Sequence, residues 1–356
     1  MRLNEPLGLR AVTTWLPATG HHVTEALAQR WLSREEADAT GYTWLPVSHD
    51  LSPPDMAVLA AGAALVRAGV PAEEISLLLH AWTYHQGHDF WSPAHYVAAR
   101  LGASRALPIG VQQMCNGAGA SVETAASRLL ADPSISNALL TTADRFAPPG
   151  FDRWRGDYGL WYGDGATAAL LSSDATDSDD LHLLAITSTA SVDMETMHRG
   201  RDEFTPAPRM HSDTVDIRRT KKAFLEINGK QAFAAVVEEL VPRLITSALA
   251  EAAVKPDEVG QVLLPRLGRT ALCAAYVPAV ARVLSAPAID LGDRSGHLGA
   301  GDLLANLADA VERDLMPPGA VAVALSAGGG FTWSAAVVQR PAHRADIQQP
   351  AEGTVS

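Results

Sequence analysis

Two segments of this 356-residue chain follow the same pattern, and this repeat constrains the fold more than any other feature. Residues 68–79 (AGVPAEEISLLL) parallel residues 252–264 (AAVKPDEVGQVLL): each ends a helical run, turns at a proline and enters an apolar strand. The elements that follow also correspond, namely helical stretches at 92–101 and from 270 onward, strands at 106–111 and 286–291, and glycine turns leading into buried strands at 163–171 and 328–338. The sequence therefore predicts a duplicated unit.

Alternating helices and apolar strands predict an α/β fold whose mainly parallel sheet is covered by helices. Duplication of such a unit predicts a layered α/β/α/β/α body. The polar stretch 172–180 lacks apolar periodicity and marks the seam between two halves, residues 1–173 and 174–356. The strand-to-helix junction carries Cys115 in the first half and His297 in the second. Because chemistry gathers at strand ends in such sheets, we expect these two side chains to meet.

The composition excludes several classes of function. A formal net charge of −12 disfavours nonspecific binding to nucleic acid or to an anionic membrane surface. The longest apolar stretch, residues 56–66, is too short to span a bilayer, and no signal-peptide core is visible, so we expect a soluble, cytoplasmic protein. One basic run, residues 218–222, helped by Arg199, Arg201 and Arg209, is a candidate surface for an acidic carrier protein.

Cys115 is the candidate nucleophile, because the start of the helix at residues 117–130 favours a thiolate beside it. The alternative is that Cys115 is a small packing residue, as most free cysteines are. The second cysteine, Cys273, lies in a helical run and is predicted to pack. The histidines between residues 80 and 95 match no zinc spacing, so we predict no metal and expect this aromatic loop to shape an acceptor pocket.

These motifs resemble the β-ketoacyl-acyl-carrier-protein synthase III family of thiolase-fold condensing enzymes. The resemblance rests on the nucleophile turn from Cys115 (CNGAGA), the strand start from Gly163 (GDGA), the segment from Asn228 (NGKQAF) and the closing run from Gly328 (GGGFTW). It implies a duplicated, five-layered thiolase-like fold and a homodimer. It also implies an acyl thioester of an acyl carrier protein or coenzyme A as donor, without a bound cofactor.

The chain departs from the family at two turns. The resemblance implies a His in the turn after the strand at 259–264 and an Asn at the later junction, but here the first turn holds Arg266 and the junction holds His297. An enolate formed by decarboxylation needs two donors on its oxygen, whereas acyl transfer to oxygen or nitrogen needs a base. The chain is therefore similar to a family offshoot that acylates sugars, aminocyclitols or other acceptors in antibiotic and polyketide pathways.

The expected mechanism is a two-step transfer. Cys115 takes the acyl group, the backbone amides of Cys115 and Gly329 stabilise the tetrahedral oxyanion, and His297 deprotonates a small-molecule hydroxyl or amine. Asp302 is the candidate partner of His297, with Asp293 and Asp164 as weaker rivals. Arg266 either faces the cavity and binds a substrate carboxylate or is an ordinary surface arginine.

Three other functions stay open from the sequence. A decarboxylative synthase would form a carbon–carbon bond with a malonyl carrier protein and release carbon dioxide. A silent scaffold would need neither Cys115 nor His297, and a cysteine hydrolase would use the same residues with water as acceptor.

Overall fold

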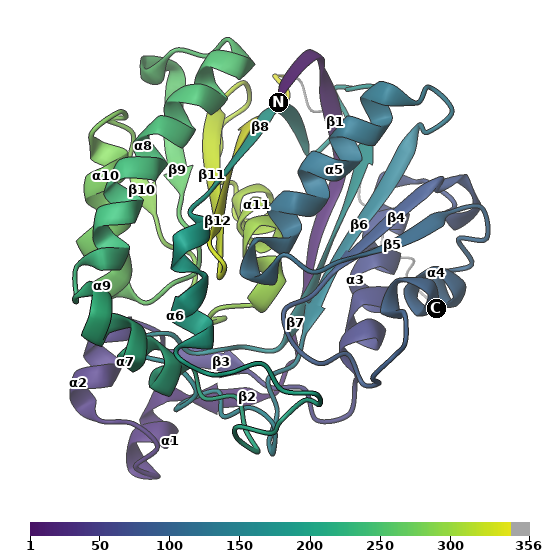
Figure 1. The fold of residues 1–356 in the computed structure, drawn as a ribbon. Coiled ribbons are helices and arrows are strands. Elements are labelled where there is room, and N and C mark those ends of the chain that lie inside the picture. Colours follow the sequence, from purple (N-terminus) through teal and green to yellow (C-terminus); the bar gives the residue numbers. More distant parts are fainter. Residues whose placement is uncertain (343–356) are drawn as a thin grey trace, which may run out of the picture.

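The computed structural model describes residues 1–342, and within them ten strands form one continuous mixed sheet (Figure 1). The strand order is β10-β9-β11-β12-β8-β1-β7-β6-β4-β5. The strands of the first half are β1 (Arg2–Trp15), β4 (Leu77–Ala81), β5 (Leu107–Val111), β6 (Asn137–Asp144) and β7 (Gly165–Ser172). Those of the second half are β8 (Leu181–Ala190), β9 (Val259–Leu263), β10 (Ala288–Ile289), β11 (Val321–Gly328) and β12 (Thr332–Gln339).

The strand order shows the duplication directly. The first strand of each half, β1 or β8, lies at the centre, and the two pair antiparallel with each other. Outward from β1 come β7, β6, β4 and β5, and outward from β8 come the equivalent β12, β11, β9 and β10. The boundary between residues 173 and 174 stays a prediction, because the sheet is continuous across it.

The expectation of a mainly parallel sheet is wrong. In each half, β4 or β9 is parallel to its two neighbours, while the remaining pairs are antiparallel. The reason lies in the connections: β11 returns into β12 through a tight turn, and no helix stands between β6 and β7. Without a crossover helix, consecutive neighbouring strands run antiparallel.

Helices cover the sheet in the expected five layers (Figure 1). α3 and α4 lie on the outer face of the first half, α5 and α11 lie between the halves, and α8 and α10 cover the second half. Their bounds are α3 (Pro53–Ala68), α4 (Pro93–Leu101), α5 (Gly117–Ala131), α8 (Ala232–Ala252), α10 (Val277–Ala281) and α11 (Asp302–Glu312). The largest apolar cluster takes residues from both halves, including Leu77 and Leu303, so the halves share a core.

Local sequence signals explain where the helices begin and end. Ser52 accepts a hydrogen bond from the backbone N–H of Asp55 at the start of α3, and Pro53 occupies its first turn. Gly69 ends α3 in the left-handed conformation (φ 65°). Pro93 begins α4, as predicted from Ser92–Pro93.

Short elements gather at one end of the layers (Figure 1). They are β2 (Gly20–His22), α1 (Val23–Ala28), α2 (Arg34–Thr40), β3 (Trp44–Pro46), α6 (Thr196–Arg199), α7 (Ile217–Asn228) and α9 (Arg269–Ala271). Across residues 1–342, no helix is long and apolar enough to cross a membrane, and no cluster of three or more potential ligand side chains is arranged to hold a metal ion.

Candidate active site

Cys115 lies in a short turn, Met114–Asn116, that joins β5 to α5. Met114 adopts a left-handed backbone conformation (φ 49°), which is uncommon for a residue with a side chain and marks a sharp, strained turn. Two hydrogen bonds fix the turn to β12 of the other half: Gln113 Nε2 donates to Thr332 Oγ1 at 3.0 Å, and Asn116 Nδ2 donates to Ser334 Oγ at 3.0 Å. The turn therefore holds the thiol at the interface of the two halves.

Small residues let the start of α5 approach the second junction. A Cβ on Gly117 would lie 2.9 Å from the Cβ atoms of both Ala81 and Ala300. A Cβ on Gly119 would lie 2.7 Å from Ser334 Oγ. The glycines of the Cys115 motif are thus required by close packing against η6 (Gly299–Gly301) and β12.

Asp144, at the end of β6, joins the two junctions. Its carboxylate accepts hydrogen bonds from the backbone N–H groups of Thr83 and Tyr84 and, at 3.0 Å, from that of Ala300. Burial raises the pKa of Asp144 to about 7, although the N–H donors favour the ionised form. Asp144 thereby holds the loop after β4 against the turn that follows His297.

His297 and Asp302 form a buried pair at the start of α11. His297 Nδ1 lies 2.6 Å from Asp302 Oδ2, and the two side chains are 1% and 3% exposed. The same oxygen accepts from the backbone N–H of Arg266 at 3.0 Å, and Asp302 Oδ1 accepts from that of Leu298 at 2.9 Å. These donors fix the carboxylate, which in turn fixes the orientation of the imidazole.

Charge at this pair favours the protonated imidazole. Burial alone would lower the pKa of His297, but the Asp302 carboxylate and Cys115 outweigh burial and raise this pKa well above its usual range. His297 Nε2 is buried and makes no hydrogen bond of ordinary geometry within residues 1–342. The edge of the Tyr162 ring packs on the imidazole at a centroid distance of 5.3 Å.

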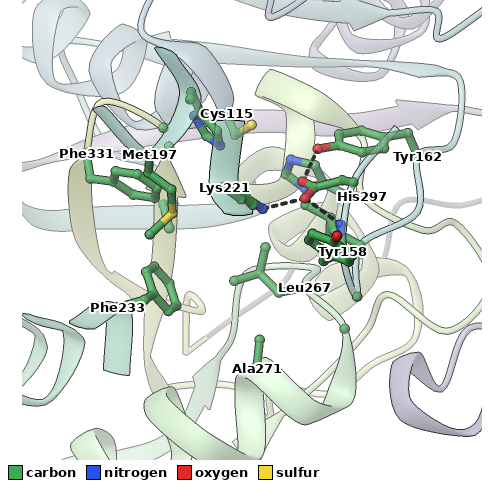
Figure 2. A pocket seen from close by; sticks show the side chains of 18 of the residues that line it. Cys115, Tyr158, Tyr162, Met197, Lys221, Phe233, Leu267, Ala271, His297 and Phe331 are labelled. Atoms are coloured by element: carbon green, nitrogen blue, oxygen red, sulfur yellow. Dashed lines mark hydrogen bonds and ion pairs between the residues drawn. The ribbon is translucent and has the colours of Figure 1, made fainter. Parts of the chain in front are cut away.

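A cavity of about 230 Å³ opens beside these residues (Figure 2). Both Cys115 and His297 line it, so the structure brings together the two side chains that the repeat predicts to meet. Most of the remaining wall is apolar or aromatic: Tyr158, Leu160, Tyr162, Met197, Leu225, Phe233, Leu267, Ala271, Tyr276, Ala327 and Phe331. A cavity with this lining suits a ligand whose surface is largely apolar.

Gly329 and Arg266 differ in their relation to this cavity. Gly329 lines it together with Cys115, and its role as an oxyanion donor stays a prediction. Arg266 does not line it: the guanidinium donates to Asn306 Oδ1 at 2.9 Å, Ser295 Oγ at 2.7 Å and Asp309 Oδ2 at 2.6 Å. At 2% exposure Arg266 is not a surface arginine either, and its geometry supports the backbone around Asp302 rather than contact with a substrate carboxylate.

Sequence reasoning missed several polar groups of the cavity wall. Asp157 is buried, receives Lys221 Nζ at 2.6 Å and accepts from Tyr162 Oη at 2.9 Å. Lys221 appeared only as part of the basic run, although its position near Phe224 and Leu225 on α7 is a helical signal for the inward face. His198, at the end of α6, also lines the cavity and carried no sequence signal of its own.

The aromatic loop after β4 does not line the Cys115 cavity. His80 is buried in β4, where burial lowers its pKa to about 4 and where it bonds Thr141 Oγ1 at 2.9 Å and Gln86 Oε1 at 3.1 Å. Tyr84 and His85 line a separate surface pocket. The prediction that Cys273 packs in the interior is wrong, because this residue is exposed.

The basic run is largely paired with acidic groups. Arg199 bonds Glu195, Arg219 bonds Asp202, and Lys221 points inward to Asp157. An adjoining groove retains further cations, and Tyr158 lines both the groove and the cavity. The charged residues of this groove are Glu36, Asp152, Arg155, Asp216, Arg218, Arg219 and Lys222.

Comparison with known proteins agrees with this architecture. The family descriptions 3-oxoacyl-[acyl-carrier-protein] synthase III and its C-terminal part match residues 109–190 and 249–340. The structure named ChlB3, an acyltransferase, is 31% identical, with a TM-score of 0.86 over 95% of this chain and 99% of that one.

Two synthases are more distantly similar. The β-ketoacyl-[acyl-carrier-protein] synthase III of Roseiflexus castenholzii is 25% identical over 80% of this chain and 82% of its own length. The solved 3-oxoacyl-[acyl-carrier-protein] synthase III of Aquifex aeolicus VF5 is 20% identical, with a TM-score of 0.74 over 94% of this chain and 99% of that chain. The second likeness shows the fold alone.

The fold and these likenesses define an enzyme that transfers acyl groups. The chain belongs to the 3-oxoacyl-[acyl-carrier-protein] synthase III family of thiolase-fold proteins, and its acyltransferase relative falls within the same fold.

Proposed function

We propose that this enzyme moves an acyl group from an acyl thioester through Cys115 to a hydroxyl or amine acceptor. The acceptor class, a sugar, an aminocyclitol or a similar molecule of secondary metabolism, follows from the resemblance stated above. Cys115, His297 and Asp302 are the proposed catalytic residues, and the amides of Cys115 and Gly329 are the proposed oxyanion donors.

The observation that carries the proposal is the isolated His297–Asp302 pair beside Cys115. A base oriented by a carboxylate is what proton removal from an acceptor requires. The position where the family resemblance implies a second imidazole holds Arg266, whose guanidinium is bound to Asn306, Ser295 and Asp309. The wall thus lacks the family's second enolate donor at that position, and this favours transfer to oxygen or nitrogen over condensation.

In the first step, the Cys115 thiolate attacks the thioester carbonyl and a carbon–sulfur bond forms. The tetrahedral oxyanion collapses, the pantetheine sulfur leaves, and it takes a proton from the His297 imidazolium. In the second step, the acceptor oxygen or nitrogen attacks the acyl-Cys115 carbonyl while neutral His297 removes its proton. Cleavage of the carbon–sulfur bond then regenerates the thiolate beside the imidazolium.

The donor is a thioester of phosphopantetheine on an acyl carrier protein or on coenzyme A. The groove that shares Tyr158 with the cavity supports this assignment, because the cations Arg155 and Lys222 line it and can donate to a phosphate next to the cavity, whereas Arg218 and Arg219 are paired with Glu36 and Asp202. No resident cofactor is needed for either step.

We also propose a homodimer. β5 lies at the edge of the sheet, and Leu107 in this strand is 52% exposed. Met114, in the nucleophile turn that follows, is 38% exposed. An edge strand with exposed apolar side chains is a surface on which a second copy can pair.

Intact-protein mass spectrometry after incubation with a panel of acyl thioesters tests the proposal. We expect an acyl adduct on the wild type and none on Cys115→Ala. The adduct should persist on His297→Ala in the presence of an acceptor that discharges the wild type. Absence of an adduct with every donor would contradict the proposal and favour a silent scaffold.

The same experiment separates the remaining alternatives. A decarboxylative synthase would release carbon dioxide from a malonyl thioester and yield a product with a new carbon–carbon bond. A hydrolase would discharge the adduct at one rate with or without an acceptor. For the proposed transferase, we expect acceptor-dependent discharge without loss of carbon dioxide.

A further inference from the structure

Lys221 places a cation at the wall of an otherwise largely apolar cavity. Its side chain is 18% exposed, projects from α7 toward Asp157 and lines the same cavity as Cys115 (Figure 2). Nζ uses one donor on Asp157 Oδ1 at 2.6 Å. An ammonium group has three N–H donors, so the pair leaves donor capacity on the cavity side.

His198 contributes a second polar group to the same wall. Nδ1 of its ring is buried and has no hydrogen-bond partner within residues 1–342. The ring stacks on Phe331 at a centroid distance of 5.3 Å, and a Cβ on Gly329 would lie 2.2 Å from Nδ1. Burial, together with the nearby Lys221 charge, lowers the pKa of His198 to about 4, so the imidazole is neutral near pH 7.

A buried imidazole nitrogen without a hydrogen-bond partner is costly unless a bound group in the site supplies one. Neither of the catalytic steps proposed above uses His198 or Lys221. Both residues face the space that the acyl group occupies once it is attached to Cys115. A polar atom of the acyl group is therefore the natural partner of these two side chains.

We propose that Lys221 and His198 form a polar subsite that selects acyl groups carrying a neutral oxygen substituent, a hydroxyl or a keto group. The proposal rests on the acyl-Cys115 intermediate proposed above. Asp157 favours a neutral ligand, because its carboxylate already neutralises the charge of Lys221 and repels a second anion at the same ammonium group. The apolar wall formed by Phe233, Phe331 and their neighbours binds the rest of a compact acyl chain.

The test uses four N-acetylcysteamine thioesters with four-carbon acyl groups: butyryl, 3-hydroxybutyryl, 4-hydroxybutyryl and succinyl. Their rates of adduct formation on Cys115 are compared by intact-protein mass spectrometry. In the wild type, at least one hydroxybutyryl ester should react about tenfold faster than butyryl, the difference expected for one good hydrogen bond, and succinyl should be slowest.

Variants assign the preference to the two side chains. Lys221→Met alone would leave the buried Asp157 carboxylate without its cation, so the double variant Lys221→Met/Asp157→Asn is made beside it, together with His198→Leu. We expect the hydroxyl preference to fall to within about threefold in each folded variant while the butyryl adduct still forms. Lys230→Met, the same change at an exposed lysine, should keep the wild-type preference.

The outcomes distinguish the two proposals. If no thioester labels Cys115 in the wild type, the proposed function fails. If adducts form but neither hydroxybutyryl ester outpaces butyryl, if succinyl reacts fastest, or if the preference survives in the double variant and in His198→Leu, the subsite is refuted and the transferase stands.

Discussion

Replacing Asp302 with asparagine tests the central geometry of the site. The carboxylate now accepts three N–H donors, from His297 Nδ1, Arg266 and Leu298, at 2.6–3.0 Å. An asparagine has one acceptor oxygen, so its NH₂ group must face at least one of these donors. The amide can therefore no longer hold His297 with its proton on Nδ1 and a free acceptor at Nε2.

We expect Asp302→Asn to lower the catalytic rate strongly and the folding free energy only moderately. Loss of the charged partner and of the correct tautomer lowers turnover on the order of 10⁴-fold in comparable catalytic triads. One buried donor left unsatisfied costs about 1–3 kcal/mol of folding free energy. We therefore expect Asp302→Asn to remain folded and to discharge acyl-Cys115 at least about 100-fold more slowly than the wild type. This factor is the lower end of what general acid–base catalysis contributes.

The direction in which the pH profile of discharge shifts gives an independent test of the pair. The Asp302 carboxylate contributes to the raised pKa of His297, so its removal lowers that pKa. Because discharge needs neutral His297, the inflection at which the rate rises with pH should move to lower pH in Asp302→Asn. The maximal rate should fall at every pH.

The assay uses mass spectrometry to follow loss of the acyl group from pre-acylated enzyme, with ethanolamine as acceptor. The pH is varied from about 5 to 9, a range that covers the ordinary pKa of histidine and values above it. Asp293→Asn is the matched control, since this exposed aspartate lies in the same loop. Two results would show that the proposed base–carboxylate pair is wrong. One is a discharge rate of Asp302→Asn within about threefold of the wild type, because general base catalysis contributes about 100-fold or more. The other is an inflection that does not move to lower pH.

Three further predictions follow from the packing of the site. Gly117→Ala places a Cβ 2.9 Å from two alanine Cβ atoms, so the free energy of unfolding should fall by about 1–3 kcal/mol and acylation of Cys115 should slow. An unchanged melting temperature and acylation rate would contradict this prediction. Folding lowers the pKa of His80 to about 4, so this imidazole should contribute a loss of about 3 kcal/mol in stability as pH falls from 6.5 to 4. Denaturant unfolding should show that His80→Gln removes this share and leaves the share of His198, whose pKa is also lowered to about 4; an unchanged pH dependence in His80→Gln would contradict the prediction. Arg266→Met should destabilise the fold by about 3–5 kcal/mol without changing the ratio of malonyl to acetyl labelling, and a shift in that ratio would restore a substrate role for Arg266.

The sequence predicts the duplicated architecture well because its signals are local. The helix ends at Ala68 and Ala252, and the strands β4 and β9 that follow them, are set by proline turns and apolar runs within a short window. Equivalent local structures pack in equivalent ways, which brings Cys115 and His297 to one cavity. Strand direction was predicted less well, since it depends on whether a connection packs as a helix, and periodicity does not show this for the loop between β6 and β7.

The polar residues of the cavity were harder to predict, because their roles depend on distant partners. Lys221 stands in a basic run, and its spacing to Phe224 and Leu225 favours the inward face of α7, but the sequence does not show that Asp157, far away in the chain, is its partner there. Arg266 is likewise indistinguishable from a surface arginine until Asn306, Ser295 and Asp309 surround it. Burial of a charge is decided by a partner, and a single sequence does not reveal which partner it will meet.

The charge on Cys115 links the two proposed steps in time. Cys115 is one of the groups that raise the pKa of His297, and an acylated sulfur carries no charge. Formation of the acyl-enzyme therefore lowers the pKa of His297 and releases the imidazole to act as a base when the acceptor must be deprotonated. Asp302 bonds His297 in the free enzyme and in the acyl-enzyme, so it sets the orientation of the imidazole. The charge on the sulfur changes between these two forms and with it the pKa of His297. On the proposed mechanism, His297 is an acid before acylation and a base after it, without any change in position.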